Sequence, residues 1–454
     1  MLSSETLTLH TLAAQLSEGR LSSSDLIELS LARIADKQGQ GSVTFTKVFA
    51  QRARQEAQAS DERRAAGQTR SVLDGLPISV KDLFDIAGYP TLAGSVVLSD
   101  TPATSDDALI VQRLRQAGAV IVGTTNMTEF AYSGLGLNPH YGTPLSPWDR
   151  QTGRIAGGSS CGAAVSVADG MVAGAIGTDT GGSVRIPAAF CGLVGYKPTA
   201  SRIDMRGTLP LSANLDSIGP IANSVADCIW LAAVMAGESI KAIGPKSLRG
   251  LKLGLPNQLV LDEMDDTVSE RFHGACRLLE QAGAVIVRLD LPELFEIAQM
   301  NAAGGFTAAQ AWAWHQDLLN DRQAKYDPRV ASRIRRGESL DKDYIERLER
   351  QRRDWIDRVA QKISSVDALV MPTVPIVPPV LAPLESDDDL YAKTNLLALR
   401  NPTVINFLDG CAVSLPCHDS GQAPVGLMLA ALAAEDQRLL GVALACERAL
   451  KKPN

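Results

Sequence analysis

Several features of membrane-bound, secreted and metal-binding proteins are missing from this chain of 454 residues. It has no run of about 18 apolar residues, so no membrane-spanning helix is expected. Its first residues lack a basic stretch followed by an apolar core, so no secretory signal is expected and a cytoplasmic location is predicted. The seven cysteines are scattered and match neither a disulfide framework nor a zinc motif. Neither a metal nor a cofactor is predicted.

Charge of one sign does not dominate either. The chain has 44 Lys and Arg against 51 Asp and Glu, a net charge of −7. This balance favours solubility and argues against general nucleic-acid binding, so neither a nucleic acid nor a membrane is predicted as a partner. Apolar residues make up 45% of the chain, which is enough for a sizeable core.

Histidine is scarce, with five in the whole chain. None lies in a recognisable Ser-His-Asp setting, and no GxSxG turn is centred on Ser159 or Ser183, so a histidine-based serine hydrolase is poorly supported. The glycine-rich segments also fit neither the GxxxxGK[ST] nor the GxGxxG phosphate-binding pattern. A generic anion-binding or structural glycine loop stays open as an alternative at this point.

Two glycine pairs, each followed by serine, are the strongest positive feature. They occur as GGSS at 157–160 and TGGS at 180–183. The small, apolar residues between them predict a buried helix over 161–168 that returns into a strand over 171–177. That arrangement would bring the two serines together. Glycine pairs let the backbone approach a bound group closely and point N–H groups at a negative oxygen, so one catalytic site is predicted.

A serine nucleophile needs a proton acceptor, and a lysine is the other known solution. Lys81 is the best candidate because it follows GLPISV at 75–80, a short run typical of a strand. An amine at the end of an apolar strand is partly desolvated, which lowers its pKa toward the neutral form that a base requires. A solvated lysine at a strand end is the alternative.

Taken together, these segments resemble the amidase signature hydrolases. The resemblance covers most of the chain and rests on the following segments: GLPISVKD at 75–82, TNMTEFA at 125–131, NPHYGTPLSPWD at 138–149, GGSS at 157–160, GTDTGGSVRIPAAFCGLVGYKPT at 177–199, LDSIGP at 215–220 and PVGLMLAA at 424–431. The lysine and both serines stand in the order and spacing of that family.

The resemblance implies a role for each of the three residues. Ser183 is expected to be the nucleophile, Ser159 the middle serine that relays protons and holds an unusual cis peptide, and Lys81 the terminal base. It also implies an oxyanion hole built from backbone N–H groups, with severe effects expected for substitutions at either glycine of the loop. The four expected donors are Thr180, Gly181, Gly182 and Ser183.

Three further residues are candidate substrate contacts: Ala131, Ser133 and Arg185. For Arg185 two alternatives stay open. It either binds a substrate carboxylate or makes a structural ion pair or hydrogen bonds to loop carbonyls. Cys161 stands where relatives carry glycine or serine, and it is expected to be a small buried residue and not a second nucleophile.

The expected fold class is α/β. Helical patterns at 24–36, 107–117 and 267–283, and strand patterns at 119–123 and 284–287, indicate repeated helix–strand units. By resemblance, residues 1–454 form a single amidase signature domain whose large, mixed, twisted sheet is covered on both faces by helices. Three further strands are expected, at 251–255, 368–371 and 425–429.

Two segments differ in composition from the rest. The segment at about 256–364 is rich in charge and predicted to be mostly helical, with alternating acids and bases that indicate a solvated helix face. The segment 371–389 combines MPTVPIVPP with ESDDD. It is expected to be an ordered surface connection that ends in a mobile loop.

Three hypotheses for function follow. The first is a stand-alone amidase of the EC 3.5.1 type that cleaves a small carboxamide to a carboxylate and ammonia or an amine. The second is the glutaminase-type A subunit of a tRNA-dependent amidotransferase, which requires companion subunits. The third is a non-catalytic metabolite binder. The expected ligand is a small-molecule amide, and a homodimer is an arrangement common among relatives.

Overall fold

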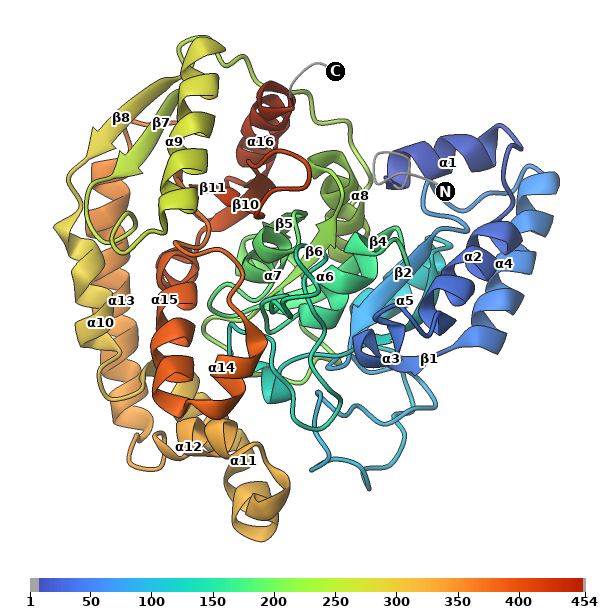
Figure 1. The fold of residues 1–454 in the computed structure, drawn as a ribbon, viewed down its shortest axis with the longest axis horizontal. Coiled ribbons are helices and arrows are strands. Elements are labelled where there is room, and N and C mark those ends of the chain that lie inside the picture. Colours follow the sequence, from blue (N-terminus) through green and yellow to red (C-terminus); the bar gives the residue numbers. More distant parts are fainter. Residues whose placement is uncertain (1–7, 452–454) are drawn as a thin grey trace.

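In the computed structural model, which describes residues 8–451, one mixed eleven-stranded sheet runs through the molecule (Figure 1). The strand order is β1-β3-β2-β4-β6-β5-β10-β11-β9-β7-β8. Strand β2 runs parallel to β3 and β4, and β7 runs parallel to β8 and β9, whereas the other neighbours are antiparallel. The predicted α/β class with a large mixed sheet is confirmed.

The strands are β1 (Phe45–Val48), β2 (Pro77–Lys81), β3 (Val120–Thr125), β4 (Gly174–Asp179), β5 (Val194–Lys197), β6 (Ser217–Ala222), β7 (Lys252–Pro256), β8 (Val285–Leu289), β9 (Ala368–Pro372), β10 (Cys411–Pro416) and β11 (Gly426–Ala431). The α-helices are α1 (Leu9–Ser17), α2 (Ser23–Ala35), α3 (Gly41–Thr44), α4 (Ala50–Ala65), α5 (Leu109–Gln116), α6 (Cys161–Ala168), α7 (Arg185–Phe190), α8 (Val225–Ala236), α9 (Asp266–Gln281), α10 (Glu296–Met300), α11 (Gly305–Arg322), α12 (Pro328–Arg335), α13 (Lys342–Ile363), α14 (Leu381–Ser386), α15 (Asp388–Phe407) and α16 (Asp436–Leu450).

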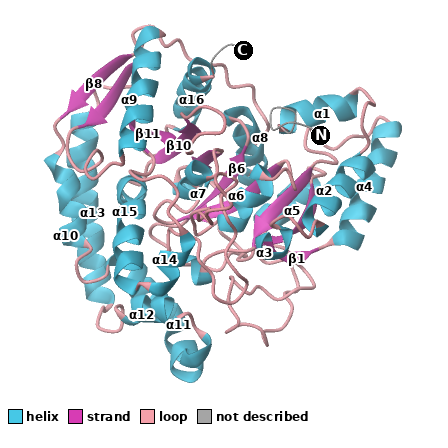
Figure 2. Ribbon diagram, in the orientation of Figure 1, coloured by secondary structure: helices cyan, strands magenta, loops and turns pink. Residues whose placement is uncertain are grey.

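Helices cover both faces of this sheet (Figure 2). Successive side chains of a strand point to opposite faces, so alternate residues enter different cores. In β9, Val370 joins the core that includes α8, α9 and α16, whereas Leu369 and Met371 join the core that includes α13 and α15. At the other end of the sheet, α2 and α6 cover the second face. Strands buried on both faces explain the continuous apolar runs seen in the sequence.

The predicted helix–strand units are present with small shifts at their ends. Helices α2, α5 and α9 and strands β3 and β8 correspond to the five patterned segments, and β7, β9 and β11 to the three further strands. The strand predicted over 171–177 begins later, at Gly174, because Met171 to Ala173 still belong to the connection from α6.

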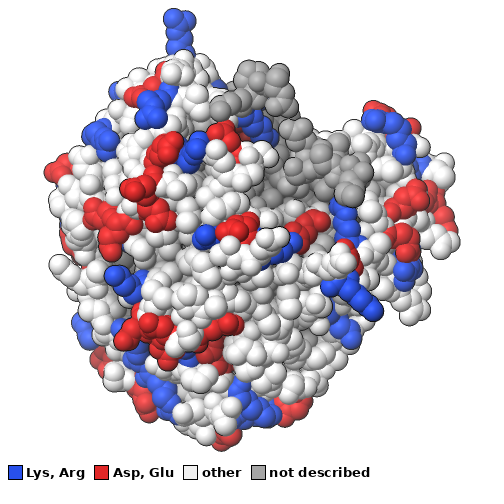
Figure 3. All heavy atoms as spheres, in the orientation of Figure 1, with Lys and Arg blue, Asp and Glu red and all other residues white. Residues whose placement is uncertain are grey.

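The charge-rich segment is mostly helical, as predicted, and contains α9 to α13 together with β8. The long helix α13 buries Leu348, Val359 and Ile363, but its buried face also contains Arg352 and Trp355. Arg352 is satisfied there by the backbone carbonyls of Asn214, Asn406 and Phe407. On the face of the molecule shown in Figure 3, acidic and basic side chains are interspersed.

The prediction of a mobile loop near 385–389 is wrong. Residues 381–386 form α14, and Asp387 caps the start of α15 by accepting from the backbone N–H groups of Asp389 (3.0 Å) and Leu390 (2.9 Å). Acidic side chains favour a helix N-terminus because they satisfy its free N–H groups and oppose its dipole. The acidic run is therefore a helix start and not a solvated loop.

None of the helices in residues 8–451 combines the length and the hydrophobicity that a membrane span requires. The seven cysteines are free thiols, and the described part of the chain holds no group of three or more His, Cys, Asp or Glu that could bind a metal.

Replacing Asp387 with alanine should destabilise the protein by about 1 kcal/mol, because the first turn of α15 loses its cap. Urea unfolding would measure the shift in midpoint. Lys393→Ala is the matched control, since Lys393 is exposed on the same helix beyond its first turn. Equal midpoints for the two variants would contradict a capping role for Asp387.

Candidate active site

The site begins at the carboxyl ends of two parallel neighbours, β2 and β4. The pairing of Val80 with Ile176 brings the last residue of β2, Lys81, close to Thr178 near the end of β4. Lys81 Nζ donates to Thr178 Oγ1 at 2.9 Å and to Ser159 Oγ at 2.7 Å. Thr178 was not predicted as a site residue. Its place in GTDTGG, two residues before the expected oxyanion donors, was the available signal.

The Lys81 side chain is completely buried. Burial disfavours the ammonium form and lowers the pKa of Lys81 from 10.5 to about 7, although the negative charges of Asp179 and Asp216 partly oppose the shift. No carboxylate forms an ion pair with Lys81 among the described residues. An amine with two hydroxyl partners and a pKa near neutrality is suited to accept a proton from one of them.

Ser159 is held immediately before α6, whose small residues pack against β2 and β4. Cys161, Ala163 and Ala164 on this helix are buried, which lets it lie close to the sheet. The peptide bond between Gly158 and Ser159 is cis, as the family resemblance implied. Burial raises the pKa of the Cys161 thiol to about 12, so it stays protonated near neutral pH.

Ser183 lies in the loop between β4 and α7 and is 4% exposed. Its carbonyl oxygen accepts from the backbone N–H of Ser160 at 3.3 Å, which ties the two serine segments together. The described residues show no hydrogen bond between the side chains of Ser183 and Ser159. Ser183 instead lines a pocket of about 410 Å³. The structure thus joins Lys81 to Ser159 by side chains and Ser183 to this pair through the backbone.

Three of the four residues expected to supply oxyanion donors line this pocket. Thr180, Gly181 and Ser183 line it, and within residues 8–451 their N–H groups have no hydrogen-bond acceptor. Gly182 differs, because its N–H donates to Asp179 Oδ1 at 2.8 Å. The expectation that the Gly182 N–H is one of four oxyanion donors is therefore corrected, because Asp179 already accepts from it, and the other three stay candidates.

A buried ion pair holds the loop from behind. Asp179 and Arg185 are both fully buried and form two hydrogen bonds, from Arg185 Nε at 3.0 Å and from Nη2 at 2.8 Å. Burial alone would raise the pKa of Asp179, but the Arg185 charge outweighs it and keeps the pKa below its usual value. Asp179 also accepts from the N–H of Val184 at 3.1 Å.

This ion pair decides between the two alternatives for Arg185. Its guanidinium is taken up by Asp179, by Asn406 Oδ1 at 2.6 Å and by the sulfur of Met428, and it does not line the pocket. Arg185 therefore makes the structural ion pair. Its prediction as a substrate contact is corrected, because this residue does not line the pocket.

Two supporting groups were not predicted. Asp216 accepts from Thr180 Oγ1 at 2.5 Å and from the backbone N–H groups of Leu211 and Ser212, so it fixes the first residue of the oxyanion loop. Asn406, near the end of α15, donates to Asp179 Oδ1 at 2.9 Å. Asp216 falls inside the LDSIGP segment, whereas no pattern marked Asn406.

Ala131 and Ser133 both line the pocket, where they were expected. Ala131 belongs to a strained turn and Ser133 follows it; in this turn Phe130 (φ 49°) and Ala131 (φ 60°) take left-handed conformations that are unusual for residues other than glycine. Ser133 Oγ donates to Asn395 Oδ1 at 2.9 Å and accepts from the Tyr391 hydroxyl at 2.8 Å. Its hydroxyl is thereby oriented by α15.

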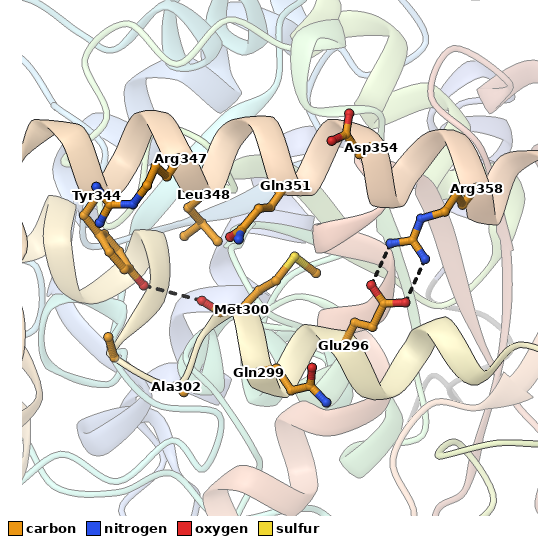
Figure 4. Close-up of a pocket in the computed structure, with 11 residues that line it drawn as sticks. Glu296, Gln299, Met300, Ala302, Tyr344, Arg347, Leu348, Gln351, Asp354 and Arg358 are labelled. Carbon is orange, nitrogen blue, oxygen red and sulfur yellow. Dashed lines mark hydrogen bonds and ion pairs between the residues drawn. The ribbon is translucent and has the colours of Figure 1, made fainter.

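A second hollow, of about 550 Å³, lies between α10 and α13 (Figure 4). Its charged groups include Glu296 and Arg358, which form an ion pair at 2.6 Å across it. It contains none of the predicted site residues, so the Ser183 pocket remains the candidate active site.

Comparison with known proteins identifies the family. The Amidase family model matches residues 25–440. The chain belongs to the amidase signature family. The predicted resemblance is confirmed over nearly the whole chain, and this amidase is a hydrolase that acts on amide C–N bonds.

Relatives of this amidase carry different activities. It is 37% identical over 400 residues to the 2-amino-5-chloromuconic acid deaminase of Comamonas testosteroni, covering 87% of this chain and 86% of that one. It is 33% identical to the A subunit of the glutamyl-tRNA(Gln) amidotransferase of Chromohalobacter salexigens, covering 98% of each. A crystal structure of an amidase superposes with a TM-score of 0.86 at 31% identity, covering 97% of this chain and 99% of the other.

Gly182→Ala should lower kcat by about a hundredfold or more, because the loop it shapes presents the oxyanion donors. Gly182 has φ 127°, and an added Cβ would lie 2.6 Å from Pro402 Cβ and 2.8 Å from Ile186 Cδ1. Steady-state kinetics on an accepted amide would measure the loss.

Gly181→Ala is the matched control for this substitution. Its Cβ would meet nothing closer than the Thr403 hydroxyl at 3.3 Å, and its φ is not left-handed. The severe effect expected for both glycines is thus restricted to Gly182, and a larger loss at Gly181 than at Gly182 would contradict the loop-shaping role of Gly182.

Proposed function

We propose that this amidase cleaves the carboxamide of a small molecule through a seryl acyl-enzyme, with Ser183 as nucleophile, Ser159 as proton relay and Lys81 as base. The observation that supports it best is the buried Lys81–Ser159 hydrogen bond of 2.7 Å beside the pocket lined by Ser183. A base and a nucleophile positioned by an intermediate hydroxyl are the requirements for activating serine without histidine.

Acylation begins with a proton transfer along this chain of groups. Ser183 Oγ attacks the amide carbonyl carbon as its proton passes to Ser159 Oγ, and Ser159 passes its own proton to neutral Lys81. Thr178 orients the Lys81 amine through their 2.9 Å hydrogen bond. Hydrogen bonds of this kind often close only when substrate binds, so the Ser183 side chain is expected to turn toward Ser159 in the complex.

The carbonyl oxygen becomes an anion in the tetrahedral intermediate. We assign its stabilisation to the N–H groups of Thr180, Gly181 and Ser183, which line the pocket. Lys81 then returns a proton through Ser159 to the nitrogen, the C–N bond breaks, and ammonia or an amine leaves. Water attacks the resulting ester with the same base, which releases the carboxylate and restores Ser183.

A second function is favoured by the match to the A subunit of an amidotransferase over 98% of both chains. In that case the chain would deliver ammonia to companion subunits. Hydrolysis of amides by the purified chain alone supports the stand-alone amidase, whereas activity only with added partner subunits supports the second function. A non-catalytic binder would not react with a fluorophosphonate.

We also propose that the described residues, 8–451, belong to one domain, since the single sheet takes strands from Phe45 to Ala431. The remaining residues of the predicted 1–454 domain lie outside the described part of the chain.

Ser183→Ala should abolish both amide turnover and labelling by a fluorophosphonate, because the attacking hydroxyl is removed. Intact-mass spectrometry would count the label, and released ammonia would report turnover. Cys161→Ala is the control and should still be labelled, because the buried Cys161 thiol is not a nucleophile. Full labelling of Ser183→Ala would eliminate Ser183 from the mechanism.

The pH dependence of kcat/KM should show the titration of Lys81. A base must be neutral, so activity should rise about tenfold per pH unit below 7 and level off above the Lys81 pKa of about 7. Lys81→Ala should lose about 10²–10⁴-fold of the rate at neutral pH. A profile that is flat from pH 5 to 9 would count against the neutral amine.

Asp82 provides the control for this profile, because burial raises the pKa of its carboxyl to about 7 as well. It accepts from the backbone N–H of Gly94 at 3.2 Å and makes no hydrogen bond to Lys81 Nζ or Ser159. The rise with pH should therefore persist in Asp82→Asn, and its disappearance there would reassign the titrating group.

A further inference from the structure

The Ser183 pocket has an uneven charge. Its lining includes three arginines, Arg333, Arg336 and Arg400, and no aspartate or glutamate. The protein as a whole has a net charge of −7, so this local excess of positive charge is opposite in sign to the average. Low-dielectric walls strengthen the field of such charges inside a cleft.

Arg400 is already occupied by protein groups. Its guanidinium donates to the carbonyl oxygen of Asp262 and to Asn401 Oδ1 at 3.1 Å, and it lies 3.8 Å from the carboxylate of Glu263. We therefore assign it to the support of α15 and leave it out of ligand binding.

Arg333 and Arg336 differ from their neighbours on the same segment. Arg329 forms an ion pair with Asp388 at 2.6 Å, and Arg335 lies 3.9 Å from Glu338. Neither of these two lines the pocket. The two arginines that do line it have no acidic partner among residues 8–451. On this segment, the two arginines outside the pocket lie near a carboxylate, whereas Arg333 and Arg336 do not.

Each of the two is nevertheless held in place. Arg333 Nη1 donates to the Tyr132 carbonyl at 2.7 Å, and its guanidinium lies 5.0 Å from the centre of the Tyr391 ring. Arg336 Nη2 donates to the Ala302 carbonyl at 3.3 Å. A guanidinium has five N–H donors, so most donors of both side chains remain for a ligand. Burial raises the pKa of the Tyr132 phenol and the positive charges of Arg333 and Arg336 partly oppose this shift, so both guanidinium groups lie near the same pocket residue.

We propose that the substrate of this amidase is an anionic amide, whose distal carboxylate binds to Arg333 and Arg336 while its amide carbonyl lies at Ser183. The planar guanidinium fork matches a carboxylate with two parallel hydrogen bonds, which makes arginine a selective partner for that group. The inference rests on the proposed role of Ser183 and names the substrate class of that site.

The rest of the pocket wall indicates the chemistry of the substrate segment between the carboxamide and the carboxylate. Its wall is largely aliphatic and aromatic, with Leu211, Leu215, Leu294, Phe295 and Ile297. These side chains offer no hydrogen bonds, so the segment between carboxamide and carboxylate should be a hydrocarbon chain. A small amide carrying a terminal acid meets all three requirements.

Two fluorophosphonate probes test the proposal without knowledge of the natural substrate. They share one hydrocarbon linker, which ends in a carboxylate in the first and in a methyl group in the second. In both, Ser183 Oγ bonds to phosphorus, fluoride leaves, and the serine proton passes to the base. The labelling rate constant of the purified full chain should be at least tenfold higher for the carboxylate probe.

Arg336→Gln and Arg333→Gln should each reduce this rate ratio, and the double variant should bring it close to one. Arg335→Gln is the matched control, because Arg335 is on the same helix as Arg333 but outside the pocket, and its ratio should stay at the wild-type value. The ratio compares two probes on one protein, so a partial loss of folded protein does not alter it.

The outcomes separate the two proposals. Equal rates for the two probes on the wild-type chain, or a preference that survives in the double variant, would overturn carboxylate recognition and leave Ser183 as nucleophile. Absence of labelling by either probe would instead overturn the proposed function, and the inference with it.

Discussion

The buried ion pair between Asp179 and Arg185 is the interaction on which the active site depends. Asp179 ends β4, and its carboxylate also holds the N–H groups of Gly182 and Val184, which flank Ser183. Removing one member of such a pair leaves an uncompensated buried charge and costs about 3–5 kcal/mol. The loop is therefore tied to the sheet at its base, and its other N–H groups stay free for a ligand.

Burial favours the uncharged form of both Lys81 and Asp179, but only Lys81 is shifted toward it. Lys81 has only hydroxyl partners, so burial lowers its pKa to about 7 and favours the neutral amine. Asp179 is equally buried but lies against Arg185, which keeps it ionised. One group is thereby suited to exchange protons, and the other is suited to hold a fixed charge. The difference in ionisation between Lys81 and Asp179 comes from their hydrogen-bond partners and not from the depth of burial.

Much of the fold and site could be predicted from the sequence, because the signals are local. The glycine pairs singled out Ser159 and Ser183, and the apolar run before Lys81 predicted a lysine at a strand end. The catalytic roles of the three residues came from the family resemblance and stay predictions. The donor role of Gly182 could not be judged, since it depends on where the Asp179 side chain points. Asn406 lies far along the chain in an ordinary helical sequence, and the acidic run at 385–389 needed its hydrogen bonds to be recognised as a helix start.

Helix α15 supplies Asn406 to the ion pair behind the Ser183 loop, and this has a consequence for synthesis on the ribosome. The residues of the Lys81–Ser159–Ser183 constellation have all been translated when less than half of the chain is complete. Asn406, which binds both Asp179 and Arg185, follows more than two hundred residues later. An emerging polypeptide would contain the three residues that we propose as catalytic before Asn406 can bind Asp179 and Arg185, so we expect hydrolytic activity to appear only after α15 has docked.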